Sequence, residues 1–314
     1  MKYSKLLASL AGIVSMMAAT IYVTSDANVN SAANDESPTY IKAADLVQYG
    51  QPNRLALQSA VALVMDDRED VMLYGRNVDR PRPIASLTKL MTALVIIESG
   101  LYLDEHIEIT REDRDRLRGT RSRLGFGAVL TRYDLLRAAL GASDNRAAAA
   151  LGRSFPGGTE AMVQAMNAKA VELGMTHTHY ADSSGLNNAN VSTARDLLLL
   201  VAETRKHSLF QNLTTVPNFV VTDRATGREI SFHNTNRLVR QETWGIGLSK
   251  TGYTAAAGNC LIMQARIGNR PLTIVLLDSW GKLSRYGDAR RIQQWLQSAE
   301  RRVPRLQTAS TSIN

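Results

Sequence analysis

The chain has 314 residues, of which 44% are hydrophobic, and a formal net charge of +8. This length and apolar content suffice for one large hydrophobic core or two small ones. The single cysteine, Cys260, excludes an internal disulfide. Because it lies in an apolar run with Leu261 and Ile262, we expect it to be a small buried residue and not a nucleophile.

The N-terminal residues 1–33 predict an export signal and therefore a periplasmic protein. Lys2 and Lys5 precede an apolar run over residues 6–23, and small residues that suit a cleavage point follow. The alternative is an uncleaved membrane anchor, since about 17–25 apolar residues span a bilayer. Elsewhere the chain has no apolar segment long enough to cross a membrane.

Composition divides the rest of the chain into three parts. Residues 34–55 are polar and predict a flexible lead-in, and residues 304–314 form a polar tail. Residues 56–303 are expected to form one catalytic domain. Within them, residues 111–123 hold six arginines against three acids. Such a patch occurs in nucleic-acid-binding proteins, but export argues against nucleic acid. An anionic cell-wall, membrane or envelope surface is the better partner, and a solvated loop is the plain alternative.

The expected elements place strands at both ends of this domain and helices in its middle. Two strands come first, five helices follow, and three strands with a closing helix finish it. Strands at both ends must pair across the helical middle, which predicts one α+β domain with an antiparallel sheet. The expected strands are 57–65, 71–74, 244–249, 259–267 and 272–278; the expected helices are 86–99, 133–140, 145–153, 160–173, 194–206 and 285–301.

Ser86 and Lys89 form the first of three short motifs, Ser-Leu-Thr-Lys. Serine needs a neighbouring base to become a good nucleophile, and residues three apart on a helix share one face. Pro83 precedes the motif and apolar residues recur at helical spacing until Gly100, so Ser86 is placed near a helix N-terminus. There the backbone N–H groups favour a developing oxyanion. A partly buried lysine can act as a base near neutral pH. The plain alternative is a helix cap beside a solvated lysine.

Ser143-Asp144-Asn145 is the second motif and is expected at a corner between two helices. Thr131 predicts the N-cap of the first helix, and an alanine-rich helix starts at Asn145. Ser143 could relay a proton to a departing amine, and Asn145 could hold Lys89 and a substrate amide. Asp144 is expected to cap the second helix, since Asp is favoured at that position.

Lys250-Thr251-Gly252 is the third motif and is expected at the end of a strand. Lys250 would attract a substrate carboxylate, Thr251 offers a hydroxyl, and Gly252 lets another backbone approach closely. Each motif is weak alone, and a second S-x-x-K begins at Ser279. Their order and local context together predict a serine acyl-transfer site.

These motifs resemble those of the active-site serine penicillin-recognising enzymes. The chain is most similar to the serine D-alanyl-D-alanine peptidase family, the low-molecular-mass penicillin-binding proteins, over residues 57–296. Residues 83–92, Pro-Ile-Ala-Ser-Leu-Thr-Lys-Leu-Met-Thr, carry the most specific likeness. Residues 178–186 and 234–238 look like two further family segments. Within the family, the chain looks most like the periplasmic endopeptidases.

The resemblance implies a β-lactamase/transpeptidase-like fold, with an antiparallel sheet, packed helices and an all-helical region. It implies that Ser86 forms an acyl-enzyme and that the backbone N–H groups of Ser86 and Tyr253 form the oxyanion hole. Lys250 and Thr251 would bind a carboxylate, with Arg285 as an additional partner. The substrates would be peptidoglycan peptides and the covalent inhibitors β-lactams. No metal or other cofactor is expected.

Several other functions share part of this pattern. A class A β-lactamase needs an E-x-x-L-N glutamate, and none occurs. A D-alanyl-D-alanine carboxypeptidase and a non-catalytic penicillin sensor share all three motifs. Carboxypeptidase relatives commonly carry a further C-terminal β domain and an amphipathic anchoring helix, and only sixty-two residues follow Gly252 here, which favours the endopeptidase. His177 and His179 could be half of a zinc site, but no H-E-x-x-H motif occurs.

Overall fold

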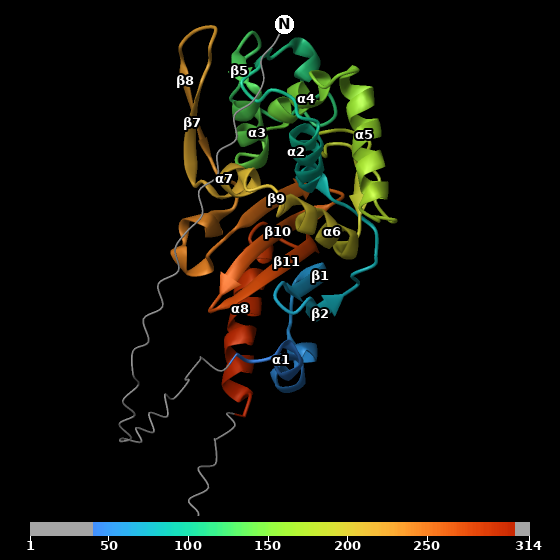
Figure 1. Cartoon of the computed structure of the whole chain (residues 1–314), viewed down its shortest axis with the longest axis vertical. Coiled ribbons are helices and arrows are strands. Elements are labelled where there is room, and N and C mark those ends of the chain that lie inside the picture. Colours follow the sequence, from blue (N-terminus) through green and yellow to red (C-terminus); the bar gives the residue numbers. More distant parts are fainter. Residues whose placement is uncertain (1–39, 305–314) are drawn as a thin grey trace, which may run out of the picture. The chain divides into compact units, whose positions relative to one another are not determined.

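A five-stranded antiparallel sheet with the strand order β2-β1-β11-β10-β9 organises the structure (Figure 1). The structure is a computed structural model that describes residues 40–304, so the expected signal and most of the tail lie outside the described residues. From Ile41 onward the described chain belongs to one compact unit. Among its helices, none has the length and apolarity needed to cross a bilayer.

The sheet joins the two ends of the domain, as predicted. The central pair is β1 with β11, in which Val61 lies opposite Leu277. The first of the three C-terminal strands, β9, forms one edge of the sheet and pairs with β10 only. The bounds are β1 Ser59–Asp66, β2 Val71–Arg76, β9 Leu248–Thr254, β10 Gly258–Ile267 and β11 Arg270–Ser279.

Two helices cover one face of the sheet: α8 (Ser284–Arg302) and α1 (Ala43–Gly50). Side chains from this face, such as Leu276, form one apolar core with both helices. The prediction of a flexible lead-in over residues 34–55 is therefore wrong for α1. Its Gly50 carbonyl accepts a hydrogen bond of 2.8 Å from Trp295 Nε1 of α8.

The other face carries the helical region, as expected. Helix α2 is buried at its centre: every residue from Lys89 to Ile96 is buried. Thr131 caps α3 and Asp144 caps α4, which confirms both predicted caps. The helices are α2 Lys89–Glu98, α3 Arg132–Leu140, α4 Asn145–Arg153, α5 Gly158–Glu172, α6 Ala194–Thr204 and α7 Leu209–Thr215.

The strand expected over residues 244–249 is wrong in position. Residues Glu242–Trp244 form a 3-10 turn, Gly245 adopts a left-handed conformation, and the strand starts at Leu248. The K-T-G motif therefore lies inside β9 and does not follow its end. Two glycines before Leu248 explain the delay, because glycine weakens a strand and favours a turn.

Three small two-stranded sheets and four more 3-10 turns complete the described chain. The longest of these sheets is the hairpin of β7 and β8, which the sequence analysis did not predict. The remaining bounds are β3 Arg82–Pro83, β4 His106–Glu108, β5 Val129–Thr131, β6 Val191–Ser192, β7 Asn218–Thr222, β8 Glu229–His233, η1 Pro52–Arg54, η2 Ala85–Thr88, η3 Arg111–Asp113 and η4 Arg237–Arg240.

Candidate active site

Ser86 lies on a 3-10 turn, η2, that leads directly into α2. Its neighbour Ala85 has φ +48°, a left-handed conformation that non-glycine residues rarely adopt. Such strain clusters at functional sites, where the surrounding structure holds it in place. The turn therefore places Ser86 at the start of a buried helix, as predicted from the spacing of the motif.

Lys89 lies under Ser86, with three oxygen atoms around its amine. Lys89 Nζ lies 2.9 Å from Ser86 Oγ and 2.7 Å from Asn145 Oδ1, and it also donates to the Ser184 carbonyl. The side chain is only 1% exposed. When the amine is neutral, it keeps two N–H donors, which suit Asn145 and Ser184, and its lone pair is left to face the Ser86 hydroxyl.

The electrostatic surroundings of Lys89 suit a base. Burial lowers the pKa of Lys89 to about 7, although the carboxylates of Asp182, Asp144 and Asp115 partly oppose this shift. Burial disfavours the charged form of an amine because water no longer solvates it. Near neutral pH a large fraction of Lys89 is therefore uncharged and able to accept a proton.

Ser143 and Lys250 form the second contact pair of the site. Lys250 Nζ donates to Ser143 Oγ over 2.8 Å and to the Thr251 carbonyl over 3.0 Å. Burial lowers the pKa of Lys250, and the positive charges of Lys89 and Arg285 lower it further. An anionic group beside Lys250 would relieve this repulsion. Ser143 itself has φ +58°, so it is a second strained residue of the site.

Asn145 links the site to the loop that follows η3. Its Nδ2 donates to Thr120 Oγ1 over 2.9 Å, which leaves Oδ1 facing Lys89. Thr120 in turn donates to Asp115 over 2.7 Å. Asp115 also accepts hydrogen bonds from the backbone of Leu117, Arg118 and Thr120. This chain of contacts fixes the orientation of the Asn145 amide.

Two glycines let three chain segments meet at Ser86. A Cβ on Gly252 would lie 3.0 Å from the Ile84 carbonyl oxygen and 3.2 Å from Ser86 N. Gly185 has φ +82°, and a Cβ there would lie 1.9 Å from the Ala85 oxygen. Gly185 therefore requires glycine and Gly252 leaves little room for a side chain, so β9 and the 182–185 segment lie directly against the turn that carries Ser86.

The remaining predicted site residues lie on or behind β9. Thr251 Oγ1 donates to Thr235 Oγ1 over 2.7 Å, and Tyr253 is 65% exposed. Arg285 Nη1 donates to the backbone carbonyls of Gly252 and Cys260, over 2.7 and 3.2 Å. Arg285 thus supports the K-T-G strand from its α8 side, and its role toward a substrate carboxylate stays a prediction.

Two other sequence expectations concern Cys260, which lies opposite Gly252 on the neighbouring strand, and the second S-x-x-K motif. Cys260 is fully buried, as predicted, and burial raises the pKa of its thiol to about 12. The second S-x-x-K begins at Ser279, which is buried in β11. The Ser279 hydroxyl hydrogen-bonds Ser59 Oγ over 2.7 Å, so it has a structural role.

Sequence analysis missed three contributors to the site. Ser184 supplies a backbone carbonyl, Asp182 accepts hydrogen bonds from the backbone of Ser184 and Gly185, and Thr235 contacts Thr251. These residues lie in the two further family segments, 178–186 and 234–238. The likeness of these two segments to the family is therefore the signal that points to them, although the residue types alone indicate no role.

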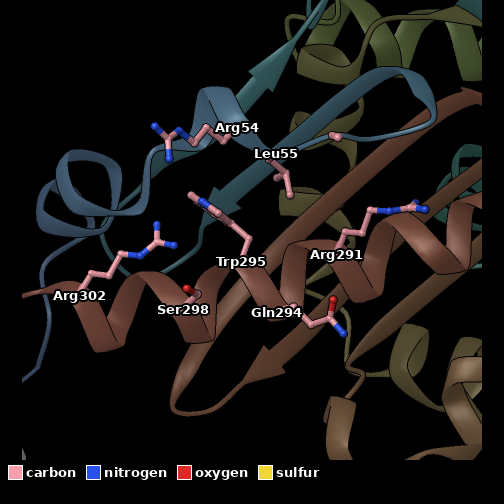
Figure 2. A pocket seen from close by; sticks show the side chains of 8 residues that line it. Arg54, Leu55, Arg291, Gln294, Trp295, Ser298 and Arg302 are labelled. Carbon is pink, nitrogen blue, oxygen red and sulfur yellow. The ribbon is translucent and has the colours of Figure 1, made fainter.

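One group of possible metal ligands exists among residues 40–304: Glu98, Glu203 and His207. It lies outside the acyl-transfer motifs, and Lys169 Nζ already lies 2.6 Å from Glu98 Oε2. A cavity of about 310 Å³ lies between η1 and α8 (Figure 2). Its Arg54 and Arg291 point in opposite directions, and Arg291 pairs with Asp288. Neither feature touches Ser86 or Lys89.

Comparison with known proteins gives a consistent result. The family model described as D-alanyl-D-alanine carboxypeptidase matches residues 47–280. A Pseudomonas aeruginosa protein named D-alanyl-D-alanine endopeptidase is 43% identical over 262 residues, covering 83% of this chain and 84% of that protein. An Escherichia coli K12 protein of the same name is 38% identical over 244 residues, covering 78% and 79%.

The fold agrees with this relationship. The crystal structure of the Streptomyces K15 DD-transpeptidase superimposes with a TM-score of 0.71 at 26% identity, covering 77% of this chain and 98% of that one. This confirms the predicted α+β, transpeptidase-like fold. Both the family match and the relatives cover most of the chain. The chain therefore belongs to the S11 serine peptidases, the D-alanyl-D-alanine carboxypeptidase family.

Proposed function

We propose that the protein is a D-alanyl-D-alanine endopeptidase that hydrolyses peptide cross-links in peptidoglycan through a serine acyl-enzyme. The observation that carries the proposal is the contact of Ser86 Oγ with the buried amine of Lys89, 2.9 Å apart. The similarity to two relatives named D-alanyl-D-alanine endopeptidase favours this activity over carboxypeptidase. The branch it resembles is the one known as penicillin-binding protein 7.

In the first half of the reaction, neutral Lys89 takes the proton of Ser86 Oγ, which attacks the D-alanine carbonyl carbon. The backbone N–H groups of Ser86 and Tyr253 stabilise the oxyanion. Ser143, held by Lys250, gives its proton to the departing amine as the C–N bond breaks. Ser143 in turn takes the proton that Lys89 received, so Lys89 is neutral again for the second half. The products of this half are an ester on Ser86 and a free amine.

In the second half, a water molecule enters and Lys89 accepts its proton as the water attacks the ester carbonyl. The tetrahedral intermediate collapses, the proton returns to Ser86 Oγ, and the acid is released. Asn145 and the Ser184 carbonyl keep the Lys89 amine in place through both halves. β-Lactams follow the first half and leave a stable ester on Ser86.

The substrate lies along β9, the edge strand of the sheet, which pairs with β10 only. Lys250 and Thr251 receive the carboxylate that stands beside the scissile amide. In a cross-link this carboxylate belongs to the second peptide strand. An endopeptidase must therefore leave room beyond Lys250 for that strand.

The protein acts in the periplasm and is exported by residues 1–33, with residues 304–314 as a polar tail. The catalytic domain then includes α1 and starts near Ile41, earlier than the boundary at residue 56 expected from composition. Association with the membrane or envelope would be loose and would rest on the net charge of +8.

Purified muropeptides test which bond is cut. We expect the protein to split cross-linked dimers faster than it releases D-alanine from a pentapeptide. Lys250→Ala should weaken both reactions, because it removes the shared anchor for the carboxylate. The matched control is Lys282→Ala, which changes an exposed lysine outside the site. Release of D-alanine with intact dimers, read by mass spectrometry, would replace the proposal with a carboxypeptidase.

The pH dependence of acylation tests the state of Lys89. Since the pKa of Lys89 is about 7 and its neutral form is the base, the acylation rate should rise with pH and level off above about pH 7. Below that value it should fall about tenfold per pH unit. Stopped-flow measurement with a chromogenic β-lactam gives the profile. A flat profile from about pH 5.5 to about pH 8.5 would contradict the role of Lys89.

A further inference from the structure

Two adjoining cavities beside the active site are both lined by Arg114 and Arg116, and we call the two cavities together the basic cleft. The inner cavity, about 220 Å³, is lined by Asn145 and Ser184 of the site and by Arg114 and Arg116. The outer cavity, about 530 Å³, is lined by the same two arginines and by Arg111. The basic cleft therefore leads outward from the residues that hold Lys89.

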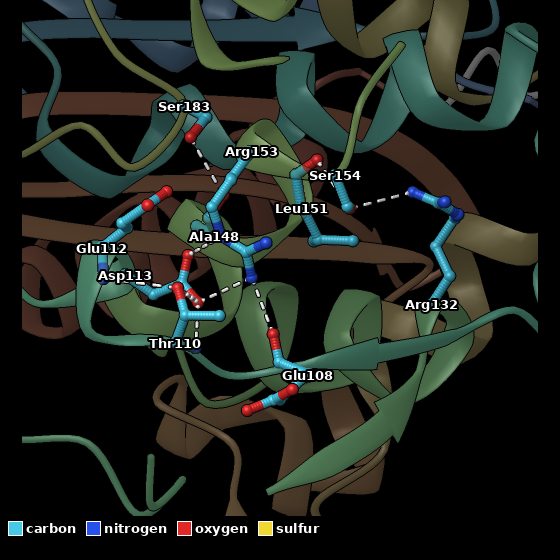
Figure 3. Close-up of polar contacts among 10 residues, drawn as sticks. All are labelled: Glu108, Thr110, Glu112, Asp113, Arg132, Ala148, Leu151, Arg153, Ser154 and Ser183. Atoms are coloured by element: carbon cyan, nitrogen blue, oxygen red, sulfur yellow. Dashed lines mark hydrogen bonds and ion pairs between the residues drawn. The ribbon is translucent and has the colours of Figure 1, made fainter. Parts of the chain in front are cut away.

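The carboxylates that line the basic cleft are already engaged. Asp113 pairs with Arg153 over 2.8 and 2.9 Å and caps the turn that starts at Thr110 (Figure 3). Asp115 accepts three backbone N–H groups and the Thr120 hydroxyl. Asp182 likewise accepts backbone N–H groups from Ser184, Gly185 and Asn187.

The arginines of the basic cleft have no such partners. Within residues 40–304, no hydrogen bond or ion pair engages the guanidinium group of Arg111, Arg114 or Arg116, and all three side chains are exposed. Guanidinium groups bind carboxylates through two parallel N–H donors. The basic cleft thus offers guanidinium donors that have no partner within this range, whereas its carboxylates keep their negative charge but have their oxygens bonded to Arg153 or to backbone N–H groups.

The loop that carries these arginines is fixed to the catalytic residues. Arg118 donates to the Leu186 carbonyl over 2.9 Å and to Asn188 Oδ1 over 2.6 Å. Thr120 contacts the Asn145 amide. The guanidinium groups therefore stand at a defined place relative to Ser86 and Lys89, which a solvated loop would not provide.

The lining residues also indicate which part of a substrate enters. The inner cavity is lined by Asn145 and Ser184 but not by Ser143, Lys250 or Thr251, which receive the leaving group. With the scissile carbonyl at Ser86, the acyl-donor peptide must extend away from Lys250. The basic cleft is the charged surface that it would meet there.

We propose that Arg114 and Arg116 bind a free carboxylate of the acyl-donor peptide and make the protein select acidic stem peptides over their amidated counterparts. This selectivity rests on the proposed function, since it concerns the substrate of the same site. Arg111 extends the charged wall toward a second acidic group farther along the donor. Stem peptides of peptidoglycan carry such side carboxylates, free or amidated.

The test compares two synthetic cross-linked substrates that differ only in the donor side carboxylate, free in one and amidated in the other. For Arg114→Gln combined with Arg116→Gln, kcat/KM should fall roughly 10- to 100-fold on the acidic substrate. It should change less than about twofold on the amide. The matched control, Arg290→Gln, changes an exposed arginine on α8 and should leave both values unchanged.

Acylation by a small β-lactam, which has no donor peptide, reports on the catalytic residues and should be unchanged in the double variant. Equal losses on both substrates, or no loss on either, would overturn the selectivity. Wild-type protein that is acylated by the β-lactam but cleaves neither substrate would instead overturn the proposed function. A fall in kcat/KM of the double variant on the acidic substrate, with no such fall on the amidated substrate, supports the contact.

Discussion

Replacing Ser86 with alanine is expected to abolish covalent penicillin labelling and to lower the peptidase kcat by roughly 10⁶-fold, the loss typical of serine hydrolases without their nucleophile. Ser86 is the hydroxyl that contacts the Lys89 amine, and Gly252 and Gly185 bring β9 and the 182–185 segment against its backbone. Ser143 also carries a hydroxyl in the site, but Lys250 holds it as a hydrogen-bond acceptor.

Mass spectrometry of tryptic peptides from penicillin-treated protein locates the adduct. Ser99→Ala is a suitable control, because Ser99 ends α2 and its hydroxyl bonds the Ile96 carbonyl. Thermal melting should show that the Ser86→Ala protein is folded, since Ser86 is only partly buried. An adduct on Ser143, or full labelling of the Ser86→Ala protein, would make Ser143 the nucleophile.

Contacts within one turn of a helix could be predicted from the sequence alone. Ser86 and Lys89 are three residues apart, and that spacing brings their side chains together in any helical turn. The caps by Thr131 and Asp144 were predictable for the same reason, since each side chain bonds a backbone group three residues on.

Contacts between distant segments could not be derived from spacing. Asn145 lies 56 residues after Lys89, and only the resemblance to a known family indicated that they meet. The Ser184 carbonyl is a backbone group, which every residue type supplies, so no residue identity points to it. The Thr120 contact to Asn145 depends on how Asp115 folds the arginine-rich loop, and local composition suggested only a charged surface there.

The missed elements have local causes. Helix α1 has eight residues, no side-chain cap and one buried large apolar residue, Leu46, so packing on α8 stabilises it more than its own sequence does. The β7–β8 hairpin did carry a signal, because in β8 the buried Ile230 and Phe232 alternate with the polar Glu229, Ser231 and His233. The late start of β9 follows from Gly245 and Gly247, whose effect outweighed the apolar residues beside them.

Lys89→Arg is expected to lower the acylation rate by roughly 10²–10⁴-fold, the usual contribution of a general base. Arginine keeps the positive charge but stays protonated, since its pKa exceeds about 12. Because Lys89 is 1% exposed, the larger side chain also strains the site, so Lys89→Met is the second variant. Methionine has a similar length, buries no charge, and should cause a comparable loss of acylation rate while removing the dependence of the rate on pH near 7.

The control is Lys169→Arg. Lys169 lies on α5 and pairs with Glu98 and Glu172, so this change should leave acylation unchanged. A loss below about threefold in the methionine variant would mean that another group accepts the Ser86 proton.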